Sequence, residues 1–109
     1  MKRYCFALDL QDDPAMIEEY ERWHTNISRD IHDSITRTGI TKMDIYRAGN
    51  RMFMIMETVD LVSLEDKARS DAEDPRVQAW EELTWRYQKP LPFAKPGEKW
   101  VLMKKIFEL

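Results

Sequence analysis

The order in which strand-like and helix-like patterns follow one another constrains the fold of this chain most strongly. Alternating apolar residues predict strands over residues 3–10, 41–47, 51–59 and 100–109. Helical spacing predicts one long helix from Pro14 to about Thr38, a short helix over 64–70 and another beginning at Pro75. This β-α-β-β-α-β order predicts an α+β, ferredoxin-like fold, in which a four-stranded antiparallel sheet carries helices on one face.

Residues with special backbone preferences mark the expected boundaries. Asp13-Pro14 and Asp74-Pro75 each combine an N-cap with a proline suited to the first helical turn. Gly39 is expected to end the long helix, and Ala48-Gly49-Asn50 to form a hairpin turn. Residues 88–99 contain three prolines and a glycine and are expected to form a loop. No repeat or linker divides the chain, so residues 1–109 are predicted to form one domain.

Composition narrows the classes of partner. The net charge is -3, from 17 basic and 20 acidic residues that are mixed along the chain, which argues against nucleic acid as a partner. The apolar runs are far shorter than the roughly 20 residues that span a bilayer, so no membrane association is expected. The single cysteine, Cys5, cannot form an internal disulfide and is expected to be a small core residue. Together with the lack of a signal-peptide pattern, it favours a cytoplasmic location.

The open face of the predicted sheet is expected to be covered by a second copy of the chain. Tyr4, Trp100, Met103 and the run Met52–Met56 supply more apolar surface than two helical regions can cover. Large exposed apolar patches are unusual on monomers. We therefore expect a homodimer that packs through its sheets.

The first helical segment carries the most suggestive polar residues. Ile17, Tyr20, His24, Ile27, Ile31 and Ile35 follow one another at steps of three and four, and so share one helix face. A histidine in such an apolar stripe must be hydrogen-bonded, and imidazole can donate and accept protons near neutral pH. His24 is therefore either a catalytic acid–base group or a core histidine satisfied by a neighbour.

Other catalytic classes find little support. His24 and His32 are the only histidines, and on one helix they would lie roughly 80° apart around the axis and about 12 Å apart along it. They cannot share a metal ion, and His32 is expected at the surface. The chain has no P-loop, dinucleotide-binding glycine motif or nucleophile elbow.

Aromatic residues provide the remaining signal, because tyrosine and tryptophan combine a flat apolar face with a polar edge, as sugars do. Most of the tryptophans are expected in the core. Tyr46 is expected on the strand face opposite Met43 and Ile45. If that face looked toward the first helix, Tyr46 would stand near Tyr20 and His24, in a cleft suited to a carbohydrate.

The chain resembles the L-rhamnose mutarotase family through Glu18-Glu19-Tyr20-x-x-x-His24, Asp44-Ile45-Tyr46, Gln78-Ala79-Trp80 and Ile106-Phe107-Glu108-Leu109. The resemblance covers nearly the whole chain. It implies a dimeric ferredoxin-like enzyme that interconverts the α and β anomers of a 6-deoxy-L-sugar without a cofactor.

The resemblance also implies roles for individual residues. His24 matches the family's proton donor, Tyr20 and Tyr46 match its sugar-binding tyrosines, and Trp80 matches the first of two adjacent tryptophans in the pocket. Glu81 stands where the family has the second tryptophan, and is expected to bind a sugar hydroxyl instead. Ser28-Arg29-Asp30 also replaces a Trp-Pro-Glu-like segment. L-fucose therefore competes with L-rhamnose as the substrate.

The expected mechanism is acid–base catalysis of ring opening. His24 would protonate the ring oxygen and recover that proton on closure, while Tyr20, Tyr46 or a water would serve the anomeric hydroxyl. Two alternatives remain from the sequence: a sugar- or metabolite-binding module without catalysis, and a small ferredoxin-like monooxygenase.

Overall fold

The sheet is antiparallel and is built around the first strand. The computed structural model describes all residues, 1–109. It contains β1 (Lys2–Leu10), β2 (Ile40–Ala48), β3 (Arg51–Thr58), β4 (Gln88–Lys89) and β5 (Val101–Leu102). The strand order is β2-β3-β1-β4, and β5 also pairs with β1. Since β3 lies between β1 and β2, the first three strands form the split β-α-β arrangement, and the ferredoxin-like prediction is confirmed.

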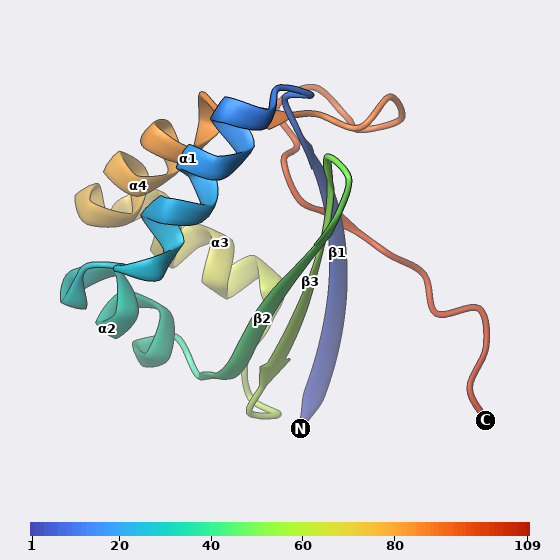
Figure 1. Ribbon diagram of the computed structural model, residues 1–109. Helices are drawn as coiled ribbons and strands as arrows, with labels where there is room; N and C mark the ends of the chain where they lie inside the picture. Colours follow the sequence, from blue (N-terminus) through green and yellow to red (C-terminus); the bar gives the residue numbers. More distant parts are fainter.

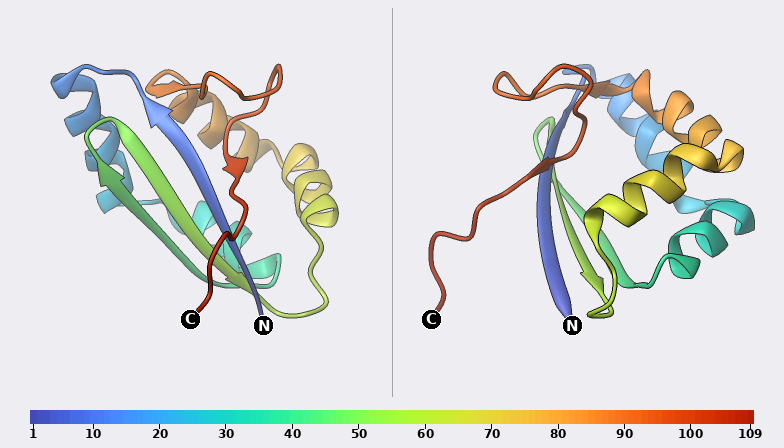
Figure 2. Two further views of the ribbon diagram at one scale, coloured as in Figure 1. Left: turned by 90° about the vertical axis from the view of Figure 1, so that its right-hand side faces the viewer. Right: turned by 180° about the vertical axis from the view of Figure 1, so that it is seen from behind.

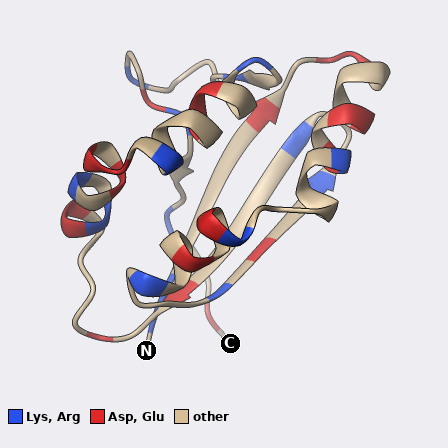
Figure 3. Cartoon of the chain, turned by 90° about the vertical axis from the view of Figure 1, so that its left-hand side faces the viewer, with Lys and Arg blue, Asp and Glu red and all other residues tan.

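All four helices lie on one face of this sheet (Figures 1 and 2). They are α1 (Pro14–Thr25), α2 (Arg29–Arg37), α3 (Leu64–Glu73) and α4 (Pro75–Trp85). Acidic and basic residues are interspersed along them (Figure 3). None of the helices is long and apolar enough to cross a membrane.

The prediction of one continuous helix over 14–38 is wrong, because the helix breaks at residues 26–28. Asn26 adopts a non-helical φ of -143°, and the Ser28 hydroxyl accepts a hydrogen bond from the Ile31 amide, 3.4 Å away. Serine favours such N-cap positions over helix interiors. The apolar stripe continues across the break, which is why periodicity alone did not reveal it.

Alternation along β3 separates the two faces of the sheet. Met52, Met54 and Met56 point toward the helices and are buried, whereas Phe53 and Ile55 point the other way and are only half-buried. The expected burial of this strand on both faces is therefore incomplete in a single chain. The core next to the helices is centred on Leu8, Leu10, Tyr20, Met52 and Tyr87.

The predicted last strand over 100–109 is largely absent. Only Val101 and Leu102 pair with β1, and Gln88–Lys89, expected in a loop, forms a second short ladder beside the same strand. Residues 104–109 leave the body of the molecule without regular structure (Figure 2). The apolar residues of this tail do not pack against the rest of the chain and remain exposed; they are Ile106, Phe107 and Leu109.

Candidate active site

A cleft of about 860 Å³ opens between the helices and the sheet. Its floor comes from the helix-facing side chains of the sheet, which include Phe6, Met54 and Met56. Its walls come from the helices and from the end of the loop before β5. This volume is within the range of roughly 300–1,000 Å³ that is typical of small-molecule sites.

His24 is presented to this cleft from the last turn of α1. Its side chain is half-buried, and its Nδ1 lies 2.9 Å from the backbone oxygen of Tyr20. Because a carbonyl oxygen can only accept, Nδ1 must carry a proton. In the neutral ring, Nε2 therefore holds the free lone pair, and it is the nitrogen that can exchange a proton with a ligand.

Two aromatic rings flank the imidazole. The Tyr20 ring lies 4.5 Å from it and the Trp80 ring 5.2 Å from it, the second in an edge-on arrangement. Tyr20 is only 4% exposed, and its hydroxyl accepts a hydrogen bond of 3.2 Å from the Gln88 side-chain amide. Burial raises the pKa of Tyr20, so the phenol stays protonated at neutral pH.

Tyr46 does not join this group, which corrects the expectation that it would stand near Tyr20 and His24. On β2 it is Met43 and Ile45 that line the cleft, and alternation places Tyr46 on the other face of the sheet. Tyr46 pairs with Phe53 of β3 and is 58% exposed. Within one chain, its hydroxyl cannot contact a ligand bound beside His24.

The rim of the cleft near α4 is polar. Glu81 lines the cleft directly after Trp80, and the Lys99 ammonium donates to the Glu81 backbone oxygen at 3.2 Å. The same ammonium lies 4.9 Å from the centre of the Trp85 ring. Partial burial lowers the pKa of Lys99, although Glu81 opposes this shift. The cleft thus offers hydrogen-bonding groups beside its apolar floor, a combination that suits a sugar.

Several cleft residues were not predicted from the sequence. Gln88 and Lys99 fell within the expected loop over 88–99, where nothing in the pattern links them to His24. Their positions depend on the short ladders that β4 and β5 make with β1. Phe6 carried a usable signal, since it belongs to the alternating apolar face of β1.

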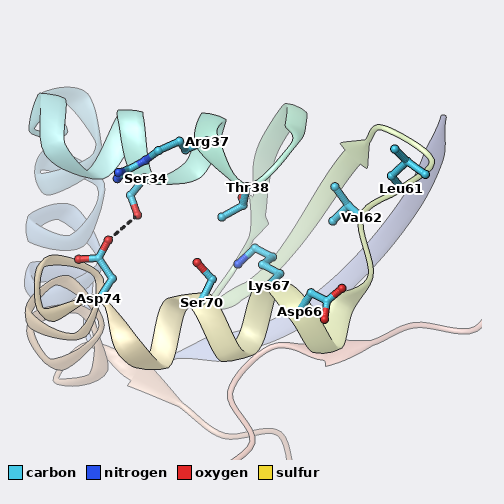
Figure 4. Close-up of a pocket in the computed structure, with 9 residues that line it drawn as sticks. All are labelled: Ser34, Arg37, Thr38, Leu61, Val62, Asp66, Lys67, Ser70 and Asp74. Carbon is cyan, nitrogen blue, oxygen red and sulfur yellow. Dashed lines mark hydrogen bonds between the residues drawn. The ribbon is translucent and has the colours of Figure 1, made fainter.

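A second, smaller hollow of about 390 Å³ lies between α2 and α3 (Figure 4). Ser34 and Lys67 line both the hollow and the cleft, so the two adjoin. The Ser34 hydroxyl donates to Asp74 at 3.4 Å, and the lining includes two acidic residues, Asp66 and Asp74, and two basic residues, Arg37 and Lys67. The hollow is best described as a polar side opening of the cleft.

No group of three or more His, Cys, Asp or Glu residues is placed to hold a metal ion. His32, the other histidine, is exposed on α2 beside Asp33. Cys5 is half-buried on the sheet face opposite the helices, and not in the core as expected.

Comparison with known proteins supports the resemblance over the whole chain. The family described as L-rhamnose mutarotase matches residues 3–109. The chain belongs to this family. An L-fucose mutarotase from Xanthomonas campestris pv. campestris is 45% identical, over 100% of this chain and 89% of that protein. A UPF0734 protein from Dictyostelium discoideum is 30% identical, over 99% of this chain and 90% of that protein.

Membership in the L-rhamnose mutarotase family makes the chain an isomerase, a sugar mutarotase. The monooxygenase interpretation of the sequence is therefore set aside.

Solved structures agree on the fold. The L-rhamnose mutarotase from Formosa agariphila superimposes with a TM-score of 0.74 at 12% identity, covering 100% of this chain and 99% of the other. The tetracenomycin F2 cyclase from Streptomyces glaucescens has a TM-score of 0.69 at 14% identity, with the same coverage.

Proposed function

We propose that the protein interconverts the α and β anomers of a 6-deoxy-L-hexose and that His24 exchanges a proton with the sugar. The main support for this proposal is that the His24 ring borders the cleft while its Nδ1 donates a hydrogen bond to the Tyr20 backbone oxygen. Proton exchange is thereby confined to Nε2. Acid–base catalysis by such a group supplies about 10²–10⁴-fold in rate.

The reaction needs only proton movements at two neighbouring oxygens. The anomeric hydroxyl loses its proton, the ring oxygen gains one, the C1–C2 bond of the open aldehyde rotates, and the ring closes on the other face. The side chains around His24 are suited to hold a sugar during this cycle. Trp80 offers an aromatic face to the C–H groups or the C5 methyl.

Among 6-deoxy-L-hexoses, we propose L-fucose as the preferred substrate and L-rhamnose as the competitor. The 45% identical relative is named an L-fucose mutarotase. Glu81 supports this choice, because a carboxylate beside Trp80 accepts hydrogen bonds from sugar hydroxyls where a second tryptophan would exclude them.

We also propose that the protein acts as a homodimer joined through the sheet face opposite the helices. This face, called the outer face here, carries Tyr46, Phe53 and Ile55 in its centre. Ion pairs between Arg3 and Glu57 and between Arg51 and Asp9 flank it. An apolar centre with a charged rim is the arrangement found in protein interfaces.

The catalytic proposal is tested by replacing His24 and measuring anomer exchange by NMR saturation transfer with L-fucose and L-rhamnose. His24→Ala is expected to lower the exchange rate by about 10²-fold or more while sugar binding persists. His32→Ala removes an exposed histidine from the neighbouring helix and is the matched control. Wild-type exchange in His24→Ala would contradict the role of His24, whereas binding without exchange in the unaltered protein would indicate a sugar-binding module.

A further inference from the structure

Two charged side chains on the rim of the cleft near α4 have no partner of opposite charge. They are Glu81 and Lys99, both half-buried. The other two charged residues of the lining, Lys67 and Asp71, bind each other at 2.5 Å. By contrast, the Glu81 carboxylate accepts only a long hydrogen bond of 3.4 Å from a glutamine amide, and the Lys99 ammonium forms no ion pair. Because charges removed from water are normally paired, this rim is suited to a polar ligand.

The surroundings of Lys99 leave at least one of its N–H groups for a ligand. An ammonium has three donors and no acceptor. One donor is used by the Glu81 backbone oxygen at 3.2 Å. The face of the Trp85 ring, whose centre lies 4.9 Å from Nζ, attracts the positive charge and can receive a second donor. The third donor is available to an oxygen atom in the cleft, which the Lys99 side chain lines.

A single hydroxyl group of a sugar can satisfy both charges at once. A hydroxyl oxygen accepts a hydrogen bond from an ammonium, and the hydroxyl proton can be donated to a carboxylate. Glu81 and Lys99 line the same cleft, and their charged groups form no ion pair with each other. A hydroxyl between them would therefore bind through two charge-assisted hydrogen bonds, which are stronger than neutral ones.

The distance of this rim from His24 indicates which hydroxyl lies there. The Trp80 ring contacts the His24 ring, whereas the Lys99 ammonium lies over Trp85, more than one helical turn further along α4. In the proposed reaction, C1 and the ring oxygen lie at His24, and C2 is bonded to C1. C4 lies across the ring from C1, so its hydroxyl extends away from His24 and toward Lys99.

We propose that the C4 hydroxyl of the sugar accepts a hydrogen bond from Lys99 and donates one to Glu81, which makes Lys99 a specificity-determining residue. This inference rests on the proposed mutarotase function and on L-fucose as its preferred substrate. In L-fucose the C4 hydroxyl is axial and stands perpendicular to the ring, whereas in L-rhamnose it is equatorial and lies along the ring edge. A site arranged around one orientation leaves its charged groups without partners when the other sugar binds.

The experiment separates C4 from C2 by measuring the anomer exchange of four sugars over a range of concentrations by NMR saturation transfer. L-Fucose and 6-deoxy-L-talose both have an axial C4 hydroxyl and differ from each other only at C2. L-Rhamnose and 6-deoxy-L-glucose both have an equatorial C4 hydroxyl and also differ only at C2. The wild type is expected to have a lower KM for the axial pair than for the equatorial pair.

Lys99→Met should raise the KM of the axial pair by about ten- to a hundredfold, the effect of losing one hydrogen bond to a charged group. The KM of the equatorial pair should stay close to that of the wild type. The kcat values should change little for all four sugars, because the C4 hydroxyl keeps the same bonds in the ground state and in the transition state. Glu81→Gln should show the same selectivity for the axial pair, since it removes the other charge.

Lys95→Met removes an exposed lysine from the same loop and is the matched control, which should behave as the wild type does with all four sugars. If Lys99→Met does not fold, Lys99→Gln keeps an N–H group for the Glu81 backbone oxygen and should show a smaller loss that is confined to the axial pair.

An equal loss for all four sugars would mean that Lys99 only anchors its loop to α4, and would overturn the inference. A wild-type KM in Lys99→Met, a loss in kcat alone, or a wild type without preference for the axial pair would overturn it as well. Failure of the proposed function is distinguishable, since the wild type would then accelerate the exchange of none of the sugars.

Discussion

Gly39 shows how one residue joins the helical layer to the sheet. It follows α2 with a φ of +92°, a conformation that L side chains rarely adopt. A Cβ at this position would lie 2.3 Å from the Val62 side chain, which is closer than packed atoms can approach. The turn into β2 and the segment before α3 can therefore approach each other only where a side chain is missing.

Gly39→Ala should destabilise the protein more than Gly49→Ala. Gly49 also has a positive φ, of 61°, but no atom lies within 4 Å of its expected Cβ. Both variants incur backbone strain of about 1–2 kcal/mol, and Gly39→Ala adds the collision with Val62. Urea denaturation of both variants measures the difference. Equal unfolding free energies would show that the contact near Val62 relaxes without cost.

Among the elements, the break between α1 and α2 affects the cleft most directly. α1 presents Tyr20 and His24, while α2 presents Ile31 and Ser34 to the same space. One continuous helix would keep a single axis and could not bend around the ligand. Capping by Ser28 therefore lets two short helices line one site from different directions.

Ser28→Ala should destabilise the protein by about 1 kcal/mol, the usual value of a lost serine N-cap. The loss arises because the Ile31 amide no longer has the hydroxyl as its acceptor. Thr36→Ala on the exposed surface of the same helix is the control, and it should change stability little. Thermal unfolding followed by circular dichroism is the measurement, and identical melting of Ser28→Ala and the wild type would argue against the cap.

The start of α4 predicts a pH effect on stability. Hydrogen bonds and charge from Arg76 hold the pKa of Asp74 below its usual value. A carboxyl whose pKa is lowered by folding stabilises the folded protein at every pH above its pKa in the unfolded chain. This contribution is lost as the pH falls through the pKa of the carboxyl in the folded protein. Asp74→Asn should therefore be less stable than the wild type at pH 7, with the gap closing below about pH 4.

Denaturant curves at several pH values test this expectation. Asp12→Asn, at an exposed position before α1, is the control and should show no such gap. If the difference in unfolding free energy between Asp74→Asn and the wild type stays the same at acid pH, the charge of Asp74 contributes nothing to stability.

How far the sequence predicts each element depends on how local its signals are. Asp13-Pro14, Asp74-Pro75 and Gly49 marked real boundaries, because capping and turn preferences act within a few residues. The break at Ser28 was missed because the apolar stripe continues through it. The last strand was predicted too long, because alternation in residues 100–109 does not reveal how much of a neighbouring strand in the same chain is free to pair with it.

At the scale of the whole molecule, the site draws on distant segments, and this limited its prediction. Tyr20 and His24 lie one helical turn apart, so the sequence alone could pair them. Tyr46 was a conditional prediction that failed, because only the assembled sheet shows which face of β2 meets the helices. Gln88 lies 68 positions after Tyr20 in the sequence, and β-sheet pairing brings the two residues together. No short-range sequence pattern encodes this contact.

Ile55→Lys should convert the proposed homodimer into monomers. Ile55 is half-buried on the outer face, between Cys5 of β1 and Asp44 of β2. A lysine there would bring a long, strongly hydrated charged side chain into the centre of an apolar interface, which is unfavourable. Sedimentation or light scattering at micromolar concentration gives the mass. Thr36→Lys on exposed α2 should remain dimeric, and a wild type that is already monomeric would contradict the interface.

The tail that follows β5 has a consequence for isotope labelling. Met103 donates its amide to the Cys5 backbone oxygen at 2.7 Å, and no later amide of the tail has a backbone acceptor. In an isolated chain, the amides of residues 104–109 should therefore exchange with deuterium at the rate of an unstructured peptide. Slower uptake that strengthens with protein concentration would show these amides sheltered by another subunit, which makes the last six residues a natural reporter of self-association.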